Sequence, residues 1–263
     1  MRIVSALLAT AVLLAGCSLL ESGAGGGGAA GGGAAGGDPD KPIAGGGGGG
    51  EPPAPAAAAR QEPDPTMVDL RPAAIDRFAI GPDGRTLVIM YWGGTPACFG
   101  LHDVLLEVQD GTPIVTVLEG TRPEAVGQPC SMEALLKSAV VTLPDALLID
   151  GSGADHPAGE PPADLAPLAV AIAPAIVDAQ PRAVQGYLLS ADGLRLTVVY
   201  VGGVEVCYGT ADVSVEAVDG ALRVTVFEGR RQGVDAACED LGVVKGVDVA
   251  LPAPLIVQAA FDS

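Results

Sequence analysis

The chain has 263 residues and a formal net charge of −18 at pH 7, because 32 aspartates and glutamates outnumber 14 lysines and arginines. The cations are scattered along the sequence, whereas phosphate binding needs clustered lysines and arginines, so the composition argues against a nucleic-acid partner. Aromatic residues make up only 3% of the chain. Ala, Gly, Val and Pro dominate, which is typical of a GC-rich genome.

Residues 1–16 are predicted to form a lipoprotein signal peptide. Arg2 precedes an apolar stretch that is too short to span a bilayer as a helix. The stretch ends at Leu14–Cys17, with the sequence Leu-Ala-Gly-Cys, which predicts cleavage before Cys17 and a diacylglycerol on its thiol. A chance cysteine behind an ordinary signal peptide is the alternative.

The predicted location is the cell envelope, on the extracytoplasmic side of the membrane (cell surface or periplasm). The acidic chain would be repelled by an anionic membrane, so we expect membrane attachment through the lipid anchor. Each buried methylene of an acyl chain stabilises that attachment by roughly 0.8 kcal/mol.

Residues 17–66 contain the lipidated cysteine and a predicted disordered Gly/Ala/Pro tether. Glycine runs such as Gly45–Gly50 favour a flexible coil, and the proline-rich run from Pro52 to Pro65 favours a stiffer extended segment. A coil of about 45 residues has a root-mean-square span of roughly 35–40 Å. We interpret the segment as a spacer that gives reach, without a recognition role.

Two copies of one pattern coincide when the chain is shifted by 109 residues, which places Cys98 on Cys207. A one-residue deletion before the last cysteine then places Lys137 on Lys245. The shift predicts two modules, at 67–150 and 176–263, joined by a Pro/Ala/Gly linker at 151–175. The other matched features are Asp83-Gly84 with Asp192-Gly193, Tyr91 with Tyr200, Gly93-Gly94 with Gly202-Gly203, Asp110-Gly111 with Asp219-Gly220, and Glu119-Gly120 with Glu228-Gly229.

Each module is predicted to be an antiparallel β meander. The order is strand, Asp-Gly turn, strand, Gly-Gly loop, strand from the first cysteine, Asp-Gly turn, strand, cysteine loop, strand. Asp-Gly between apolar runs predicts a type I′ hairpin, which needs positive φ at both central residues. The expected fold class is mainly β, with two tandem antiparallel β-sandwich (Ig-like) or small β-barrel modules.

Alternation of apolar and polar residues predicts which side chains face inward. In the second module Arg195, Thr197 and Val199 are expected to face outward. The inward set is Leu194, Leu196, Val198, Tyr200, Val213, Val215, Val224, Val226, Val249 and Leu251, with Leu87, Ile89, Tyr91, Val104, Leu106, Val115, Val117, Val141 and Leu143 in the first module.

The four remaining cysteines are predicted to form one disulfide in each module. Cys98 begins the third strand and Cys130 follows the fourth, and an antiparallel hairpin brings these two ends together; the same holds for Cys207 and Cys238. Closing a loop of about 33 residues stabilises a module by roughly 3–4 kcal/mol in the chain-entropy model. Metal binding by the thiols is disfavoured, since no Cys-x-x-Cys spacing occurs and the compartment is oxidising.

The polar residues shared by both modules offer one candidate for chemistry. Asp103 with Glu107, and Asp212 with Glu216, lie an even number of residues apart and so share the outward face of a strand. Such pairs suit Ca²⁺ binding or acid/base work. The alternatives are a solvated charged face or ion pairing with Arg122 and Lys137 (Arg231 and Lys245).

Other chemistry has little support in the sequence, and no metal or cofactor site is predicted. His102 is expected to be an ordinary surface residue, and His156 lies in the linker. Glu119 followed by Arg122 suggests a local ion pair at a strand end.

An asymmetry between the modules marks a candidate binding surface. Val88, Met90 and Trp92 form an apolar stripe on the outward face of the second strand, where the other module has Thr197, Val199 and Val201. An exposed apolar patch with the chain's one tryptophan indicates a partner or ligand surface. A second buried face, or the place where the other module packs, explains the stripe equally well.

The lipobox at Leu14–Cys17, the glycine-rich tether and the paired Tyr-x-Gly-Gly…Cys and Glu-Gly-x-Arg motifs resemble tandem-repeat surface lipoproteins of GC-rich bacteria. The resemblance implies no active site. We therefore expect a non-catalytic envelope protein that binds a protein or glycan. The alternatives are an enzyme that uses Asp103 and Glu107, and a protease-inhibitor or chaperone-like accessory protein that uses loops such as Gly93–Ala97.

Overall fold

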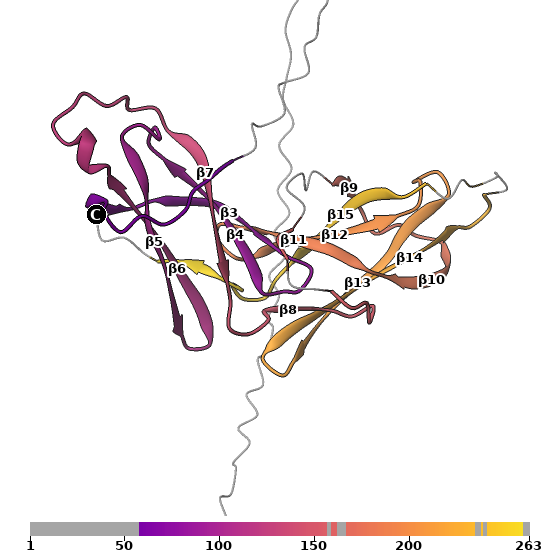
Figure 1. Ribbon diagram of the computed structural model, residues 1–263. Coiled ribbons are helices and arrows are strands. Elements are labelled where there is room, and N and C mark those ends of the chain that lie inside the picture. Colours follow the sequence, from indigo (N-terminus) through magenta and orange to yellow (C-terminus); the bar gives the residue numbers. More distant parts are fainter. Residues whose placement is uncertain (1–57, 157–158, 162–166, 235–237, 239–240, 260–263) are drawn as a thin grey trace, which may run out of the picture. The chain divides into compact units, whose positions relative to one another are not determined.

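The computed structural model describes residues 58–156, 159–161, 167–234, 238 and 241–259 (Figure 1). The predicted signal peptide, Cys17 and the predicted tether up to residue 57 lie outside the described residues. The mainly β class is confirmed: the described residues form sixteen strands and one 3-10 turn at Pro123–Ala125. No helix in this part of the chain is long and apolar enough to cross a membrane.

The strands of the two repeats correspond one to one, with eight in each repeat, and five of the eight follow the predicted order. The first repeat contains β1 Ala59–Arg60, β2 Val68–Pro72, β3 Ala74–Ile80, β4 Thr86–Gly93, β5 Phe99–Gln109, β6 Thr112–Thr121, β7 Leu135–Thr142 and β8 Leu148–Asp150. The second contains β9 Leu168–Val170, β10 Ile176–Arg182, β11 Val184–Ser190, β12 Arg195–Gly202, β13 Tyr208–Val218, β14 Ala221–Arg231, β15 Val243–Ala250 and β16 Val257–Gln258.

β1 and β9 lie in segments for which the sequence predicted a tether and a linker. Both are short edge strands that pair in parallel with the last long strand of their repeat, Ala59 with Lys137 and Leu168 with Lys245. These segments have no alternating pattern, so backbone pairing rather than side-chain burial defines them.

Two of the four Asp-Gly pairs form the predicted two-residue hairpins. Asp110-Gly111 and Asp219-Gly220 have positive φ at both residues and join β5 to β6 and β13 to β14. The type I′ prediction is wrong at Asp83 and Asp192, where only the following glycine has positive φ.

At Asp83 the side chain, not the backbone, closes the turn. Its Oδ1 accepts hydrogen bonds from the backbone N–H groups of Arg85 (3.1 Å) and Thr86 (3.0 Å). Burial opposes the charged form, but these bonds outweigh it and lower the pKa of the Asp83 carboxyl below its usual range. A side chain at Gly84 would overlap the carbonyl of Leu148, so the turn glycine also lets β8 pass close by.

The three sheets join the repeats instead of separating them. The largest sheet has the order β1-β7-β4-β3-β11-β12-β15-β9, so β3 of the first repeat pairs with β11 of the second (Figure 1). The second sheet contains β5, β6, β2 and β16, and the third contains β13, β14, β10 and β8. Each repeat thus completes its own smaller sheet with the terminal strand of the other. Alternation in the sequence predicts faces but not which edges pair, which is why this exchange was missed.

One hydrophobic core contains side chains from all three sheets and both repeats. Two residues depart from the predicted pattern: Leu194 is exposed in the turn before β12, and Val199 on the outer face is fully buried. The inward residues that are fully buried are Leu87, Ile89, Tyr91, Val115, Val117, Leu143, Leu196, Val198, Tyr200, Val224, Val226 and Leu251, and the partly buried ones are Val104, Leu106, Val141, Val213, Val215 and Val249.

Because the core is shared, a cavity in the second repeat should also lower the stability of the first repeat. Leu196→Ala removes a fully buried side chain of the second repeat and should lower the free energy of unfolding by about 2–5 kcal/mol. Trp92, the only tryptophan, reports on the first repeat. We expect urea unfolding followed by Trp92 fluorescence to shift as far as unfolding followed by far-UV circular dichroism.

The control is Leu194→Ala, which removes an exposed side chain and should change stability by no more than about 0.5 kcal/mol. A fluorescence transition that stays in place while circular dichroism reveals a second, weaker transition would show that the repeats unfold independently.

Candidate binding site

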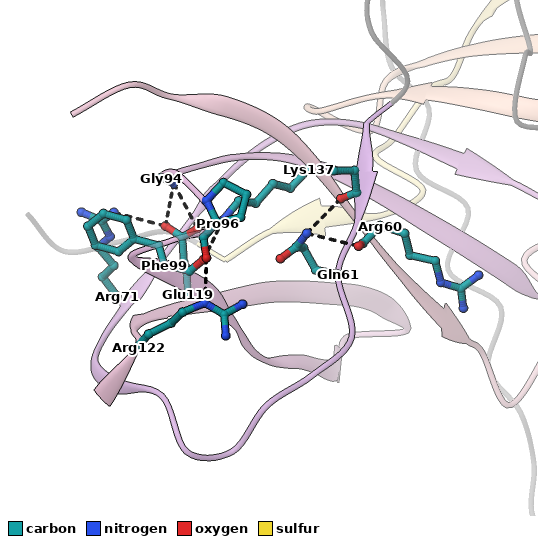
Figure 2. A network of polar contacts seen from close by, with 10 residues as sticks. Arg60, Gln61, Arg71, Gly94, Pro96, Phe99, Glu119, Arg122 and Lys137 are labelled. Carbon is teal, nitrogen blue, oxygen red and sulfur yellow. Dashed lines mark hydrogen bonds and ion pairs between the residues drawn. The ribbon is translucent and has the colours of Figure 1, made fainter. Parts of the chain in front are cut away.

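A buried carboxylate organises one end of the first repeat (Figure 2). Glu119, near the end of β6, accepts hydrogen bonds from Lys137 Nζ at 2.7 Å, from the Gly94 N–H at 3.1 Å and from Arg71 Nη2 at 3.1 Å. The side chains of Glu119 and Lys137 are 2% and 1% exposed, whereas Arg71 is half exposed. Lys137 Nζ also donates to the Phe99 carbonyl at 3.2 Å. The carboxylate therefore ties together β2, β6, β7 and the Gly-Gly loop.

The second repeat contains the same arrangement around Glu228. Lys245 Nζ lies 2.6 Å from Glu228 Oε1, and the Gly203 N–H donates to Oε2 at 3.0 Å. Arg182 Nε forms an ion pair with Oε2 at 3.3 Å, without the alignment of a hydrogen bond. The repeat register places Gln180, not Arg182, on Arg71. The second cation is thus supplied from a different strand position in each repeat.

The sequence did not predict these partners. Arg122, expected beside Glu119, instead donates from Nε to the Pro96 carbonyl at 2.7 Å (Figure 2). In the second repeat Arg231 Nε donates to the backbone carbonyl of Glu205 at 2.6 Å. Lys137 pairs with Glu119 and not with Asp103 or Glu107. One signal was available: Lys137 lies on the same strand face as the inward-facing Ala139, Val141 and Leu143, which predicts a buried ammonium group.

Removal of one partner of this ion pair should cost more than removal of both charges. Lys137→Ala leaves the Glu119 carboxylate buried without its ammonium partner, and should lower the free energy of unfolding by about 3–5 kcal/mol. Lys137→Met combined with Glu119→Gln removes both charges and keeps an acceptor for the Gly94 N–H, so it should recover most of this loss. Urea unfolding measures both, and a double variant as unstable as the single one would contradict the argument.

A pocket of about 270 Å³ lies beside the Glu119 network. Arg71 stacks over the Phe99 ring, with the guanidinium carbon 4.6 Å from the ring centroid. Trp92 is 46% exposed, and its Nε1–H donates to Asp76 at 3.2 Å. Met132 in the cysteine loop is 92% exposed. The pocket therefore combines a held cation, two aromatic rings and a flexible thioether; its lining residues are Arg71, Pro72, Ala73, Ala74, Trp92, Gly93, Gly94, Phe99, Glu119, Ser131, Met132, Glu133 and Ala134.

The twin pocket of the second repeat, about 260 Å³, has a different lining. Val201 stands in place of Trp92, and Tyr208 stands in place of Phe99. Leu241 and Gly242 take the place of Glu133 and Ala134. The scaffold is shared, and the side chains at the mouth are not.

Of the predicted apolar stripe, only Trp92 lies at this pocket. Val88 and Met90 share its face of β4 but are partly buried, and Met90 Sδ lies 3.1 Å from Arg77 Nε. The stripe is thus neither one open surface nor a second buried face. Its exposed end is the part available to a partner.

Each repeat contains one disulfide. The structure contains Cys98–Cys130 and Cys207–Cys238, the predicted pairs. Cys98 immediately precedes β5, and Cys130 immediately precedes the pocket residues Ser131 and Met132. The first disulfide therefore ties the loop that carries Met132 to the end of β5. Both bonds are compatible with an oxidising, extracytoplasmic location.

The four predicted carboxylates lie on exposed faces of β5 and β13. Asp103 and Asp212 each accept a hydrogen bond from the N–H of the next residue, at 2.8 and 2.9 Å. Glu107 and Glu216 are exposed on the same faces. Among the described residues, no three His, Cys, Asp or Glu side chains lie close enough together to hold a metal ion.

The histidines and buried tyrosines lie away from the pocket lining. His102 is partly buried on β5, while His156 Nε2 lies 2.6 Å from Asp150 Oδ2. Burial raises the pKa of Tyr91, and burial, partly offset by a hydrogen bond with Thr210, raises the pKa of Tyr200 to about 12. Both phenols therefore stay protonated near neutral pH and are poor bases.

Comparison with known proteins finds no matching family model, curated protein or solved structure. The candidate site therefore depends on the geometry of this chain alone.

Proposed function

We propose that the protein is a lipid-anchored envelope protein on the extracytoplasmic side of the membrane. Its pocket around Trp92 binds a partner protein without catalysis. The observation that carries the proposal is the half-exposed tryptophan at the pocket, beside an arginine that is fixed by both Phe99 and Glu119. Tryptophan and arginine are the side chains most enriched among residues that dominate protein–protein binding energy.

The pocket is better suited to binding than to chemistry. The carboxylate that lines it most deeply, Glu119, is already bonded to three donors and cannot readily act as a base. Arg71 is held in place before any partner arrives, which lowers the entropy cost of using it. Met132 adds an adaptable apolar surface at the rim.

Trp92→Ala tests the binding role. A partner identified by photo-crosslinking in native envelopes, then purified, should bind Trp92→Ala at least tenfold more weakly, a loss of about 1.4 kcal/mol or more. The melting temperature should change little, because the indole ring is half exposed. Val201→Ala, the same position in the second repeat, is the matched control and should bind like the wild type. Equal affinity of Trp92→Ala and wild type for the crosslinked partner would refute the proposed role.

Cys17→Ser tests the anchor. Cells that express the variant should release the protein from the membrane fraction, because the thiol that accepts the diacylglycerol is gone. Labelled palmitate should appear in the wild-type protein and not in the variant. Membrane retention of the variant without label would overturn the lipid-anchor proposal.

A further inference from the structure

We propose that Gln258, in β16, is a positioning residue for the pocket around Trp92, and that Asp150 has the same role for the twin pocket. The proposal rests on the proposed function for its consequence in binding. Its structural basis is a two-fold exchange of terminal strands between the repeats.

The exchange has an internal two-fold axis. β3 and β11 pair antiparallel with Ala79 opposite Leu188, which are equivalent positions in the two repeats. On either side, Tyr187 pairs with Ile80, and Leu189 pairs with Phe78. These two pairs are equivalent, because Tyr187 corresponds to Phe78 and Leu189 corresponds to Ile80 in the repeat register. Pairing of equivalent residues with each other is typical of an isologous interface, in which every contact occurs twice.

The terminal strands obey the same symmetry. Val257 of β16 pairs with Ile114 of β6, and Ile149 of β8 pairs with Arg223 of β14. These two pairs are equivalent under the repeat register, with the one-residue deletion taken into account. Leu148 and Ile256, the residues next to these pairs, are 1% and 0% exposed. The terminal strand of each repeat therefore buries a side chain in the shared core beside the smaller sheet of the other repeat.

Gln258 uses this position to hold the wall of the pocket. Its Oε1 accepts a hydrogen bond from the Ile75 N–H at 3.1 Å, and its Nε2 donates to the Ala73 carbonyl at 3.3 Å. Ala73 lies where the chain passes from β2 in one sheet to β3 in another, and Ala73 and Ala74 line the pocket. The side chain thus bonds one backbone group between β2 and β3 and a second one at Ile75, a part of β3 that does not pair with β11.

The second repeat supports this interpretation independently. Asp150, the equivalent of Gln258, accepts a hydrogen bond through Oδ2 from the Val184 N–H at 3.0 Å, and Val184 is the equivalent of Ile75. Arg182, two residues earlier, lines the twin pocket and pairs with Glu228. An acceptor from the exchanged strand on the same backbone N–H is therefore the shared feature, whether it is an amide or a carboxylate.

The test uses the full chain with Trp92 as the reporter. Gln258→Ala should increase the acrylamide quenching of native Trp92 fluorescence and weaken binding of the crosslinked partner about tenfold, as expected when a pocket wall loses two hydrogen bonds. Gln109→Ala removes an exposed glutamine of the first repeat and should leave both unchanged. Gln258→Glu keeps the acceptor for Ile75 but loses the donor to Ala73, so its quenching should lie between those of the wild type and Gln258→Ala.

The outcomes separate this proposal from the proposed function. If Trp92→Ala binds normally, the binding role fails, while the quenching of Gln258→Ala still measures positioning. If Trp92→Ala weakens binding but Gln258→Ala changes neither quenching nor affinity, positioning by the exchanged strand is wrong. Gln258→Glu behaving like Gln258→Ala would equally overturn it, because the acceptor would then not be what holds the wall.

Discussion

The pairing of β3 with β11 is the constraint on which the other features depend. An unpaired strand at the edge of a sheet exposes a row of backbone donors and acceptors. Here two copies of the same edge cover each other, with Ala79 opposite Leu188. Once equivalent edges pair about a two-fold axis, a backbone pairing from one repeat to the other is expected to recur in reverse. The exchange of β8 and β16 obeys that symmetry, and both repeats contribute to a single core.

The buried ion pairs serve geometry more than stability. Desolvation of two charges largely cancels their attraction, so an apolar pair could be equally stable. An apolar side chain could not, however, bond the Gly94 N–H, the Lys137 ammonium and the Arg71 guanidinium at once, as Glu119 does. The carboxylate fixes the Gly-Gly loop and the arginine relative to each other. In the second repeat Glu228 has the same role with Arg182. Both repeats therefore contain the carboxylate, although the arginine comes from a different position of the repeat.

The sequence predicted the local structure and little of what joins it. Period-two alternation identified the strands and their inner faces, because a strand with one buried face has apolar residues at every second position. The type I′ prediction failed at Asp83, because its carboxylate closes the turn and β8 packs against Gly84. Pairing of β3 with β11 depends on backbone groups that every residue has, so no residue type could reveal it. The sequence predicted a binding surface that includes Trp92, but it predicted no pocket, because Arg71 and Gln258 act across sheet boundaries that the sequence does not mark.

The duplication provides an internal comparison for the role of Trp92. The second repeat builds the same Gly-Gly loop, buried ion pair and disulfide with Val201 at that position. A tryptophan is therefore not needed for this scaffold to form. Trp92 remains 46% exposed, so it contributes less burial than a core aromatic would. A large apolar side chain that the scaffold does not require, at the mouth of a pocket with a held arginine, is the feature on which the proposed binding role rests.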